Sequence, residues 1–348
     1  MTQALPVQGA LPWLAEPLAA MLDHPAHALL VVGSPGVGAF ELQLTLAQAW
    51  LCEGGPERPC GQCGSCHLVG ARSHPDLVVL LPETQRVALG WEMAEATVDG
   101  GAAKRKPSRQ IRIGEVRAAI DWVTKTNSRG RAKVLVLHPA EAMNPQSANA
   151  LLKTLEEPPA GVRLLLSCSD PEHLLPTVRS RCQRIVLPAP APDVAAAWLH
   201  GQGVDEPETL LAACSGRPLD ALAMARAGID GDAWRAIPGA VAAGRADALA
   251  GWTLAAAIDA LQKVCHDAMA VAAGGAGRYF PSGTVAGGAD LGRLAEWSAL
   301  LARAARVDEH PFNEALQIEA LLLRGREAWR HKGQQGDAKA RRFVTLRP

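Results

Sequence analysis

The sequence is poor in aromatic residues, carries no net charge and has no apolar run long enough to cross a bilayer. Aromatic residues make up 4% of the chain, and most of them are its 9 tryptophans. Lysine plus arginine equals aspartate plus glutamate at 35 each, so global charge does not attract nucleic acid or a membrane surface. No stretch reaches the roughly 20 apolar residues of a membrane span. Any basic surface must therefore be local, and no membrane partner is expected.

The first 13 residues also lack the pattern of a signal peptide, because no basic region precedes an apolar run. We therefore expect a cytoplasmic protein. In that reducing compartment, the 8 cysteines favour metal ligation or free thiols over disulfides. A chain of 348 residues with 48% hydrophobic residues is long enough for two or three domains with sizeable cores.

Short apolar runs in the first half of the chain are typical of buried strands, and helix-like segments separate them. This alternation predicts a parallel five-stranded sheet covered by helices on both faces, an α/β fold. The best-marked helix should begin after Asn144, a candidate N-cap followed by Pro145, and end at Pro158. The five runs cover residues 28–32, 76–81, 133–137, 163–168 and 184–187.

A proline-rich hinge at residues 187–192 is the clearest boundary in the chain. Everything after the hinge has the pattern of helix, with alanine and leucine dominating. Longer helical patterns extend from about residue 232 to residue 331, interrupted by a glycine-rich stretch. Three short helices, enough for a small bundle, are expected before them, at residues 193–201, 206–215 and 219–227.

The first predicted strand runs into the frame of a Walker A phosphate loop, G-x-x-x-x-G-K-[ST]. Gly33, Gly36 and Gly38 keep the backbone shape, but Ala39 and Phe40 replace the lysine and the hydroxyl residue. A working loop needs the lysine to neutralise phosphate charge and the hydroxyl to bind Mg²⁺. The frame thus predicts a P-loop NTPase scaffold whose electrostatic hold on a nucleotide is lost. The alternative is an ordinary turn from strand to helix.

The second half of an ATP site is also missing from the sequence. A Walker B motif would place an acidic residue directly after the strand at residues 133–137, where this chain has His138-Pro139. Glu141 follows, but only past the proline. Two independent losses predict that this chain neither binds nor hydrolyses ATP.

Four cysteines with the spacing C-x₇-C-x₂-C-x₂-C predict a zinc module at residues 52–66. All four positions are thiolate ligands, so no coordination position is left for water, and one structural Zn²⁺ per chain is expected. His67 is a competing ligand, and unligated thiols are the alternative. The remaining cysteines are expected to be mostly buried thiols. The predicted ligands are Cys52, Cys60, Cys63 and Cys66.

These features combine with two further strings, Leu151-Leu-Lys-Thr-Leu-Glu-Glu-Pro-Pro159 and the triplet Ser180-Arg181-Cys182. Together they resemble the family of delta-prime subunits of the bacterial DNA polymerase III clamp loader, within the AAA+ clamp-loader proteins. The resemblance is strongest over about residues 25–220. It implies a RecA-like AAA+ domain at 1–189 carrying the zinc module, a three-helix lid at 190–230 and a helical collar at 231–348.

The resemblance also implies a function and partners. The chain would be a stator subunit of the polymerase III holoenzyme, not an enzyme on its own. It would assemble with gamma/tau and delta subunits in a hetero-pentamer that loads the beta sliding clamp onto primed DNA. Arg181 would act in trans as an arginine finger in the ATP site of a neighbour, with Arg179 and Arg184 close by. Leu219 stands where ATP-binding relatives carry a sensor arginine, and Arg217 is two residues away.

Two alternatives remain open from the sequence: an active ATPase of the gamma/tau type, and a stand-alone zinc-containing DNA-binding protein. Residues 83–109 are expected to be flexible, and their Lys104-Arg105-Lys106 run either is solvated or contacts DNA phosphates. The same choice applies to a second basic set. That set is Lys125, Arg129, Arg131 and Lys133.

Overall fold

The chain forms two compact units, Met1–Val194 and Ala195–Pro348, in a computed structural model that describes residues 11–91, 106–306 and 313–329. The first unit contains a five-stranded sheet in the order β2-β3-β4-β1-β5, with every pair parallel. This confirms the predicted RecA-like sheet, and each strand lies within a residue or two of its predicted range. The strands are β1 Ala28–Val32, β2 Leu77–Leu80, β3 Lys133–Leu137, β4 Val162–Cys168 and β5 Gln183–Val186.

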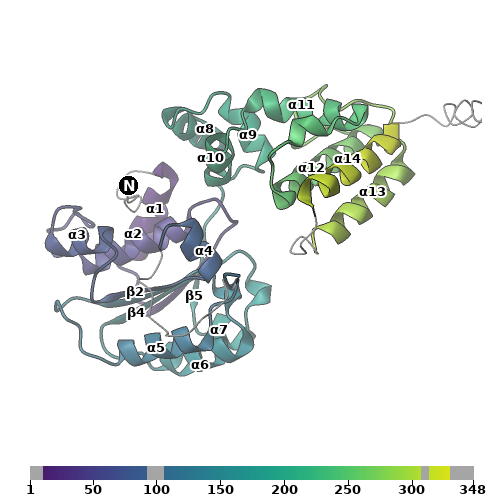
Figure 1. Cartoon of the computed structure of the whole chain (residues 1–348). Helices are drawn as coiled ribbons and strands as arrows, with labels where there is room; N and C mark the ends of the chain where they lie inside the picture. The colour runs from purple at the N-terminus through teal and green to yellow at the C-terminus, as the bar shows by residue number, and fades with distance from the viewer. Residues whose placement is uncertain (1–10, 92–105, 307–312, 330–348) are drawn as a thin grey trace, which may run out of the picture. The chain divides into compact units, whose positions relative to one another are not determined.

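Helices cover both faces of the sheet (Figure 1). Strands β1 and β3 are buried along their whole length, as their apolar residues predict, and Lys133, the charged first residue of β3, is buried with them. One face carries α1 Ala15–Leu22, α2 Ala39–Leu51 and α3 Gly64–Gly70, and the other carries α5 Ile113–Val123, α6 Pro145–Glu156 and α7 Pro176–Arg179. Short helical turns lie between them: η1 Pro12–Leu14, α4 Glu83–Ala88, η2 Ala140–Ala142 and η3 Pro171–His173.

Helix α6 begins and ends where the sequence predicts. The Asn144 side chain accepts a hydrogen bond of 2.8 Å from the Ser147 backbone N–H, and Pro145 occupies the first helical position. The helix ends at Glu156, just before the Pro158-Pro159 pair. Its apolar face, with Leu151 and Leu155 fully buried, packs into the core beneath the sheet. The N-cap at Asn144 and the proline pair thus set the two ends of the helix that carries most of the string at residues 151–159.

The second unit is entirely helical in its described residues. A continuous core that includes Trp234 and Leu261 joins its helices. Helices α8, α9 and α10 confirm the three short helices predicted at the start of this part of the chain. The division of the unit into a lid and a collar stays a prediction. The helices are α8 Pro192–Gly201, α9 Pro207–Ala213, α10 Pro218–Arg226, α11 Gly231–Ala243, η4 Ala246–Leu249, α12 Leu254–Ala272, α13 Leu291–Ala304, α14 Glu314–Arg326 and η5 Glu327–Trp329.

The prediction of a flexible segment over residues 83–109 is wrong at its start. Glu83–Ala88 forms α4, and the Glu83 carboxylate accepts a hydrogen bond of 2.7 Å from the Ser108 backbone N–H. That carboxylate also pairs with Arg112 at 2.6 Å. Lys104 and Arg105 lie outside the described residues, as does the basic tail from Lys332 onward.

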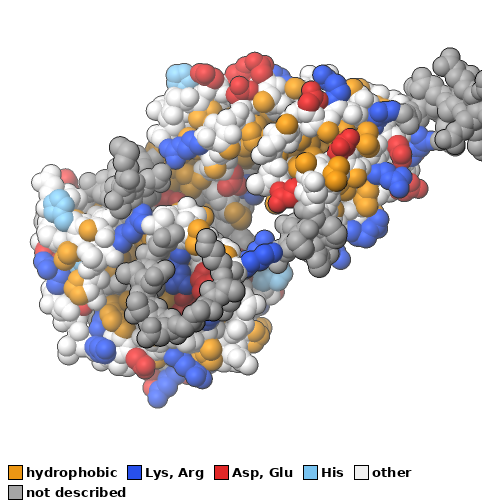
Figure 2. All heavy atoms as spheres, in the orientation of Figure 1, with side chains coloured by type: hydrophobic (Ala, Val, Ile, Leu, Met, Phe, Trp, Pro, Cys, Tyr) orange, Lys and Arg blue, Asp and Glu red, His pale blue; other side chains and the backbone are white. Residues whose placement is uncertain are grey.

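Within the described residues, no helix combines the length and the apolar character of a membrane span. On the face drawn in Figure 2, basic and acidic side chains are interspersed, as the balanced charge of the sequence predicts.

Close packing between α13 and α14 gives a matched stability test. A Cβ added at Gly325 would overlap the indole ring of Trp297, whereas one added at the exposed, helical Gly239 would meet nothing within 4 Å. We expect Gly325→Ala to lower the free energy of unfolding by about 1–3 kcal/mol through overpacking. Gly239→Ala should be neutral or raise it by up to ~1 kcal/mol. Denaturant unfolding of both variants measures the contrast, and equal stabilities would show that α14 does not sit against Trp297.

Candidate functional site

The phosphate-loop frame is present in three dimensions. Residues 33–38 connect β1 to α2, and the Gly33 N–H donates to the Cys168 carbonyl oxygen at the end of β4. Gly36 and Gly38 have backbone φ angles of 73° and 100°, values that residues other than glycine rarely adopt. A Cβ at Gly38 would also lie 2.9 Å from Leu11. The glycines thus keep a loop of the Walker A shape at the carboxyl edge of the sheet.

Aromatic rings stand at one Walker A position and one Walker B position of the sequence, and they contact each other. Phe40, only 7% exposed, stacks on the His138 ring with centroids 4.9 Å apart and 26° between planes, and Trp91 lies 5.7 Å from Phe40. His138 Nδ1 is 2.6 Å from the Ser167 hydroxyl. Burial lowers the pKa of His138 to about 4, so its ring is neutral at pH 7. The Walker A and Walker B positions therefore contact each other through uncharged rings.

Glu141 contacts the chain just after β4, at the same edge of the sheet. Its Oε1 accepts hydrogen bonds from the Ser169 backbone N–H at 2.8 Å and from the Ser169 hydroxyl at 2.6 Å. Ser169 directly follows β4, so Glu141 is fixed to the end of β4, not to the end of β3. Glu141 thus lies past the proline and away from the end of β3, as the sequence indicates, and its Oε1 is engaged by Ser169.

The four predicted cysteine ligands come together. Their sulfur atoms all lie within 4.8 Å of one another, with 3.9 Å between Cys52 and Cys63 and 4.0 Å between Cys60 and Cys66. Tetrahedral zinc with Zn–S bonds of about 2.3 Å needs sulfurs about 3.8 Å apart. The donor set and its spacing thus fit a four-coordinate metal ion.

Local structure explains how the sequence places these sulfurs. Cys52 is the residue at the C-terminal end of α2, Cys63 is the N-cap of α3, and Cys66 lies in the first turn of α3. Cys60 is carried by the intervening loop. A Cβ at Gly54 would lie 2.8 Å from the Cys60 sulfur, so the loop passes too close for any other residue.

Backbone N–H groups point at the sulfurs. Cys52 Sγ accepts from Gly54 at 3.3 Å and from Cys60 at 3.4 Å, and Cys63 Sγ accepts from Glu53 and Cys66 at 3.4 Å each. Burial opposes ionisation of Cys63, but hydrogen bonds from these N–H groups and from neighbouring thiols outweigh it and lower its pKa to about 6. Such bonds stabilise thiolates, which are the form that binds a metal.

The remaining cysteines and His67 do not join this cluster in the part of the chain that the structure describes. His67 is exposed on α3. The other thiols are buried or half-buried, as predicted, and burial raises their pKa values. Those values are about 12 for Cys168 and Cys182 and about 11 for Cys214 and Cys265.

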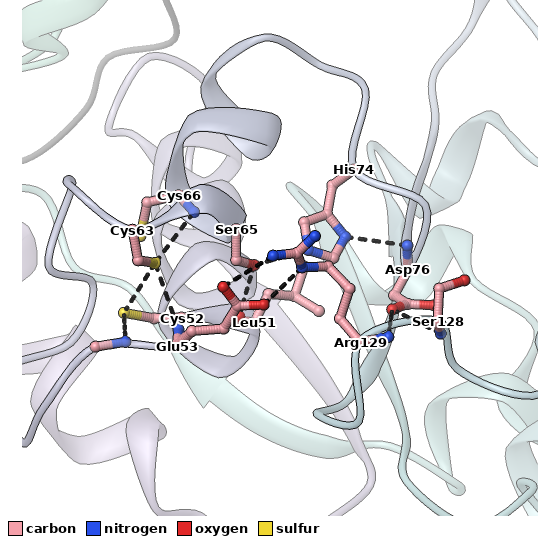
Figure 3. Close-up of polar contacts among 11 residues, drawn as sticks. Leu51, Cys52, Glu53, Cys63, Ser65, Cys66, His74, Asp76, Ser128 and Arg129 are labelled. Atoms are coloured by element: carbon pink, nitrogen blue, oxygen red, sulfur yellow. Dashed lines mark hydrogen bonds and ion pairs between the residues drawn. The ribbon is translucent and has the colours of Figure 1, made fainter.

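Polar contacts tie the cysteine module to the loop that precedes β3 (Figure 3). Glu53, next to the predicted ligand Cys52, binds Arg129 through two hydrogen bonds of 2.6 and 3.0 Å. Asp76 is buried, and its carboxylate accepts the backbone N–H groups of Ser128 at 2.8 Å and of Arg129 at 3.0 Å. Hydrogen bonding from Arg129 is the main reason that the pKa of Glu53 is lowered.

A second set of contacts starts at Ser65, next to the predicted ligand Cys66. Its hydroxyl donates to the Leu51 carbonyl at 2.6 Å and lies 2.7 Å from His74 Nε2, while His74 Nδ1 accepts from the Asp76 backbone N–H at 3.0 Å. Burial is the main reason that the pKa of His74 is lowered. No sequence signal indicates this network, because its residues are spread from position 51 to position 129.

Two members of the predicted basic set have structural roles instead. Arg129 is bound to Glu53, and Lys133 is buried, donating 2.7 Å to the Lys125 carbonyl while its ammonium lies 4.6 Å from the Trp122 ring centroid. Lys125 and Arg131 are exposed. The four side chains therefore do not form one basic surface.

Arg181 lies just after α7 and contacts α6. Its Nε donates 2.6 Å to Glu156 Oε1, its Nη2 pairs with the same oxygen, and its Nη1 donates 2.8 Å to the Thr177 carbonyl. The side chain remains 31% exposed. Arg179 is bound to Glu172 at 2.5 Å, and Arg184 lies on the exposed edge strand β5.

An apolar residue, Leu219, stands at the position where the resemblance implies a sensor arginine in ATP-binding relatives. Leu219 lies in the first turn of α10, and the neighbouring Arg217 is held by Asp220 at 3.0 Å and by the Cys214 carbonyl at 2.8 Å. The Arg217 side chain is thus bound to residues at the N-terminal end of α10.

Known proteins with similar sequences point to one family. A profile of the family described as DNA polymerase III, delta subunit, matches residues 16–191. The chain is 38% identical to DNA polymerase III subunit delta' of Pseudomonas aeruginosa over 205 residues, which are 56% of this chain and 55% of that protein. It is 35% identical to the Escherichia coli subunit delta' over 215 residues, 60% of this chain and 56% of that protein.

A DNA polymerase III subunit tau from Salmonella typhimurium is 34% identical over 164 residues, 47% of this chain and 22% of that protein. The chain spans about half the length of the subunit delta' relatives it matches. The profile match and these identities converge with the sheet order and the motifs. The chain therefore belongs to the delta-prime family of DNA polymerase III clamp-loader subunits.

Proposed function

We propose that this chain is a stator of a clamp loader, a subunit that does not hydrolyse ATP itself. The stacked, uncharged Phe40 and His138 rings carry this proposal. Phosphates need a cation and Mg²⁺ needs oxygen ligands, and the side chains at the two Walker A and two Walker B positions supply neither. The loop backbone alone offers N–H groups, which are insufficient to hold Mg-ATP against water.

The proposal assigns Arg181 as an arginine finger in trans. A guanidinium can bind γ-phosphate oxygens in pairs and stabilise the charge that shifts during phosphoryl transfer. Arg181 and Arg179 are both partly exposed and each is paired with a glutamate, so exposure and pairing do not separate them, and the Ser180-Arg181-Cys182 triplet carries the choice. The triplet supports Arg181 as the residue of the segment that reaches a neighbour.

The proposal also assigns one structural Zn²⁺ to the module formed by Cys52, Cys60, Cys63 and Cys66. Four sulfur donors favour zinc, and a closed set of ligands leaves no position for catalysis. When bound, the ion cross-links the end of α2 to the start of α3. The module would then act as a rigid attachment for the loop bound by Glu53 and Asp76.

The proposed partners are gamma/tau and delta subunits in a cytoplasmic hetero-pentamer that loads a beta sliding clamp onto primed DNA. Similarity to both delta' and tau proteins supports this assembly. The test is co-purification with gamma/tau and delta, followed by clamp loading with and without this chain. Loading that proceeds equally well without the chain would contradict the role.

Equilibrium binding of a labelled ATP analogue to the isolated chain tests the ATP-free site. We expect no Mg²⁺-dependent binding at micromolar concentration, because Ala39 and Phe40 supply neither charge nor hydroxyl. An active gamma/tau subunit, measured in parallel, is the positive control. Micromolar, Mg²⁺-dependent binding by this chain would instead support an active ATPase.

A further inference from the structure

The guanidinium group of Arg181, the proposed finger, uses only some of its N–H groups in hydrogen bonds within this chain. A guanidinium has five N–H groups. Glu156 Oε1 takes the Nε–H and one N–H of Nη2, and the Thr177 carbonyl takes one N–H of Nη1. The Ser180 hydroxyl lies 3.5 Å from Nη1, at the limit of a hydrogen bond. One N–H of Nη2 thus remains without an acceptor, and the second N–H of Nη1 has only this long contact to give up. A phosphate accepts hydrogen bonds from two guanidinium N–H groups.

Buried neighbours fix both partners of this pair. Glu156 is the last residue of α6 and directly follows Leu155, which is buried in the sheet core. Arg181 follows α7, whose Val178 is buried in the same core. The carboxylate and the guanidinium are therefore presented by packed elements, although they are 25 positions apart in the sequence.

The ion pair between Arg181 and Glu156 should add little to the folding stability of the chain. Both side chains are partly exposed, 31% for Arg181 and 47% for Glu156, and surface ion pairs add little to folding. The adjacent Glu157 is also exposed, and no side-chain partner is found for it within the described residues. Of these two neighbouring glutamates, only Glu156 binds Arg181.

We propose that Glu156 is a positioning residue for Arg181. By occupying the Nε edge, it restricts the guanidinium to one orientation. In that orientation an N–H of Nη2, and the N–H of Nη1 that has only the long contact to Ser180, can turn to a phosphate of the neighbour's nucleotide. This inference rests on the proposed trans role of Arg181. The carboxylate does not have to leave for the phosphate to bind, because the two anions use different N–H groups.

The experiment uses the reconstituted clamp loader with Glu156→Gln, and Glu157→Gln as the matched control. ATP hydrolysis is measured in the presence of clamp and primed DNA. We expect Glu156→Gln to lower kcat on the order of 10-fold with KM unchanged, because a misplaced group loses transition-state contacts. Glu157→Gln should match wild type. Thermal melting of the isolated chain should be the same for all three proteins.

Combining variants separates positioning from other roles. In an Arg181→Ala background, Glu156→Gln should have no further effect, since it acts only through the guanidinium. An equal loss in that background, or a wild-type or higher rate for Glu156→Gln alone, would overturn the inference. If Arg181→Ala itself leaves the rate unchanged, the proposed function has failed instead, so the two failures are distinguishable.

Discussion

Arg181→Ala is expected to reduce ATP hydrolysis at the neighbouring subunit on the order of 10³-fold, while this chain still folds and assembles. The large effect follows from charge: the guanidinium would be the cation supplied across the interface as charge shifts on the γ-phosphate. Folding should be unaffected, because Arg181 is a partly exposed side chain whose ion pair adds little stability. Clamp-stimulated ATPase of the reconstituted loader measures the rate.

The control for this prediction is Arg179→Ala. Arg179 comes from the same short segment and also pairs with a glutamate, Glu172, but that glutamate lies in the adjacent turn. Its loss should leave the rate near wild type. Arg181→Lys should recover only part of the activity, because an ammonium keeps the charge but not the paired N–H groups. A fully active Arg181→Ala loader would rule out the trans role.

Features that depend on contiguous sequence were predictable. The strands are short apolar runs, the α6 N-cap is Asn144 followed by Pro145, and the Cys52–Cys66 spacing brings four sulfurs together. Each of these signals lies within a dozen or so residues, so local propensity and spacing determine the result. The phosphate-loop frame belongs with them, because glycines, strand and helix are adjacent in the chain.

Features that depend on tertiary pairing were not predictable. Glu156 and Arg181 are 25 positions apart, and Glu53 and Arg129 are 76 apart. No sequence period links such residues, and the neighbours of Arg129 in the chain are typical of a basic surface. The stacking of Phe40 on His138 could not be predicted from the sequence either, although the absence of the Walker A lysine and hydroxyl residue is clear there. The helix at residues 83–88 escapes prediction because it is only 6 residues long and is held partly by a residue distant in sequence.

Removing zinc is expected to unfold the cysteine module and release the loop before β3, while the helical unit keeps its structure. Structural zinc contributes on the order of 10 kcal/mol to folding of its site, so four bare sulfurs would not hold residues 52–66 together. Glu53 and Ser65 lie next to the proposed ligands Cys52 and Cys66 and bind Arg129 and His74, so these contacts should be lost together. Metal analysis should find about one zinc per chain before chelation.

Hydrogen exchange measures the release. After chelation, or in Cys60→Ser, exchange should rise in peptides covering 52–76 and 124–132, because the Ser128 and Arg129 amides depend on the Asp76 carboxylate. Peptides from α12 in the other unit should keep their protection. Increased exchange throughout the chain, or none in residues 124–132, would contradict the coupling of module and loop.

Two neighbouring glycines, Gly54 and Gly55, allow a direct test of the proposed zinc site through its affinity for zinc. A Cβ at Gly54 would lie 2.8 Å from the Cys60 sulfur and 3.3 Å from the Cys52 sulfur, whereas one at Gly55 would meet nothing within 4 Å. Gly54→Ala must therefore displace a ligand and should weaken zinc binding on the order of 10- to 100-fold, and Gly55→Ala should bind as wild type. Competition with a chromogenic chelator gives both affinities. Equal affinities would mean that the sulfurs do not converge on a metal as this geometry requires.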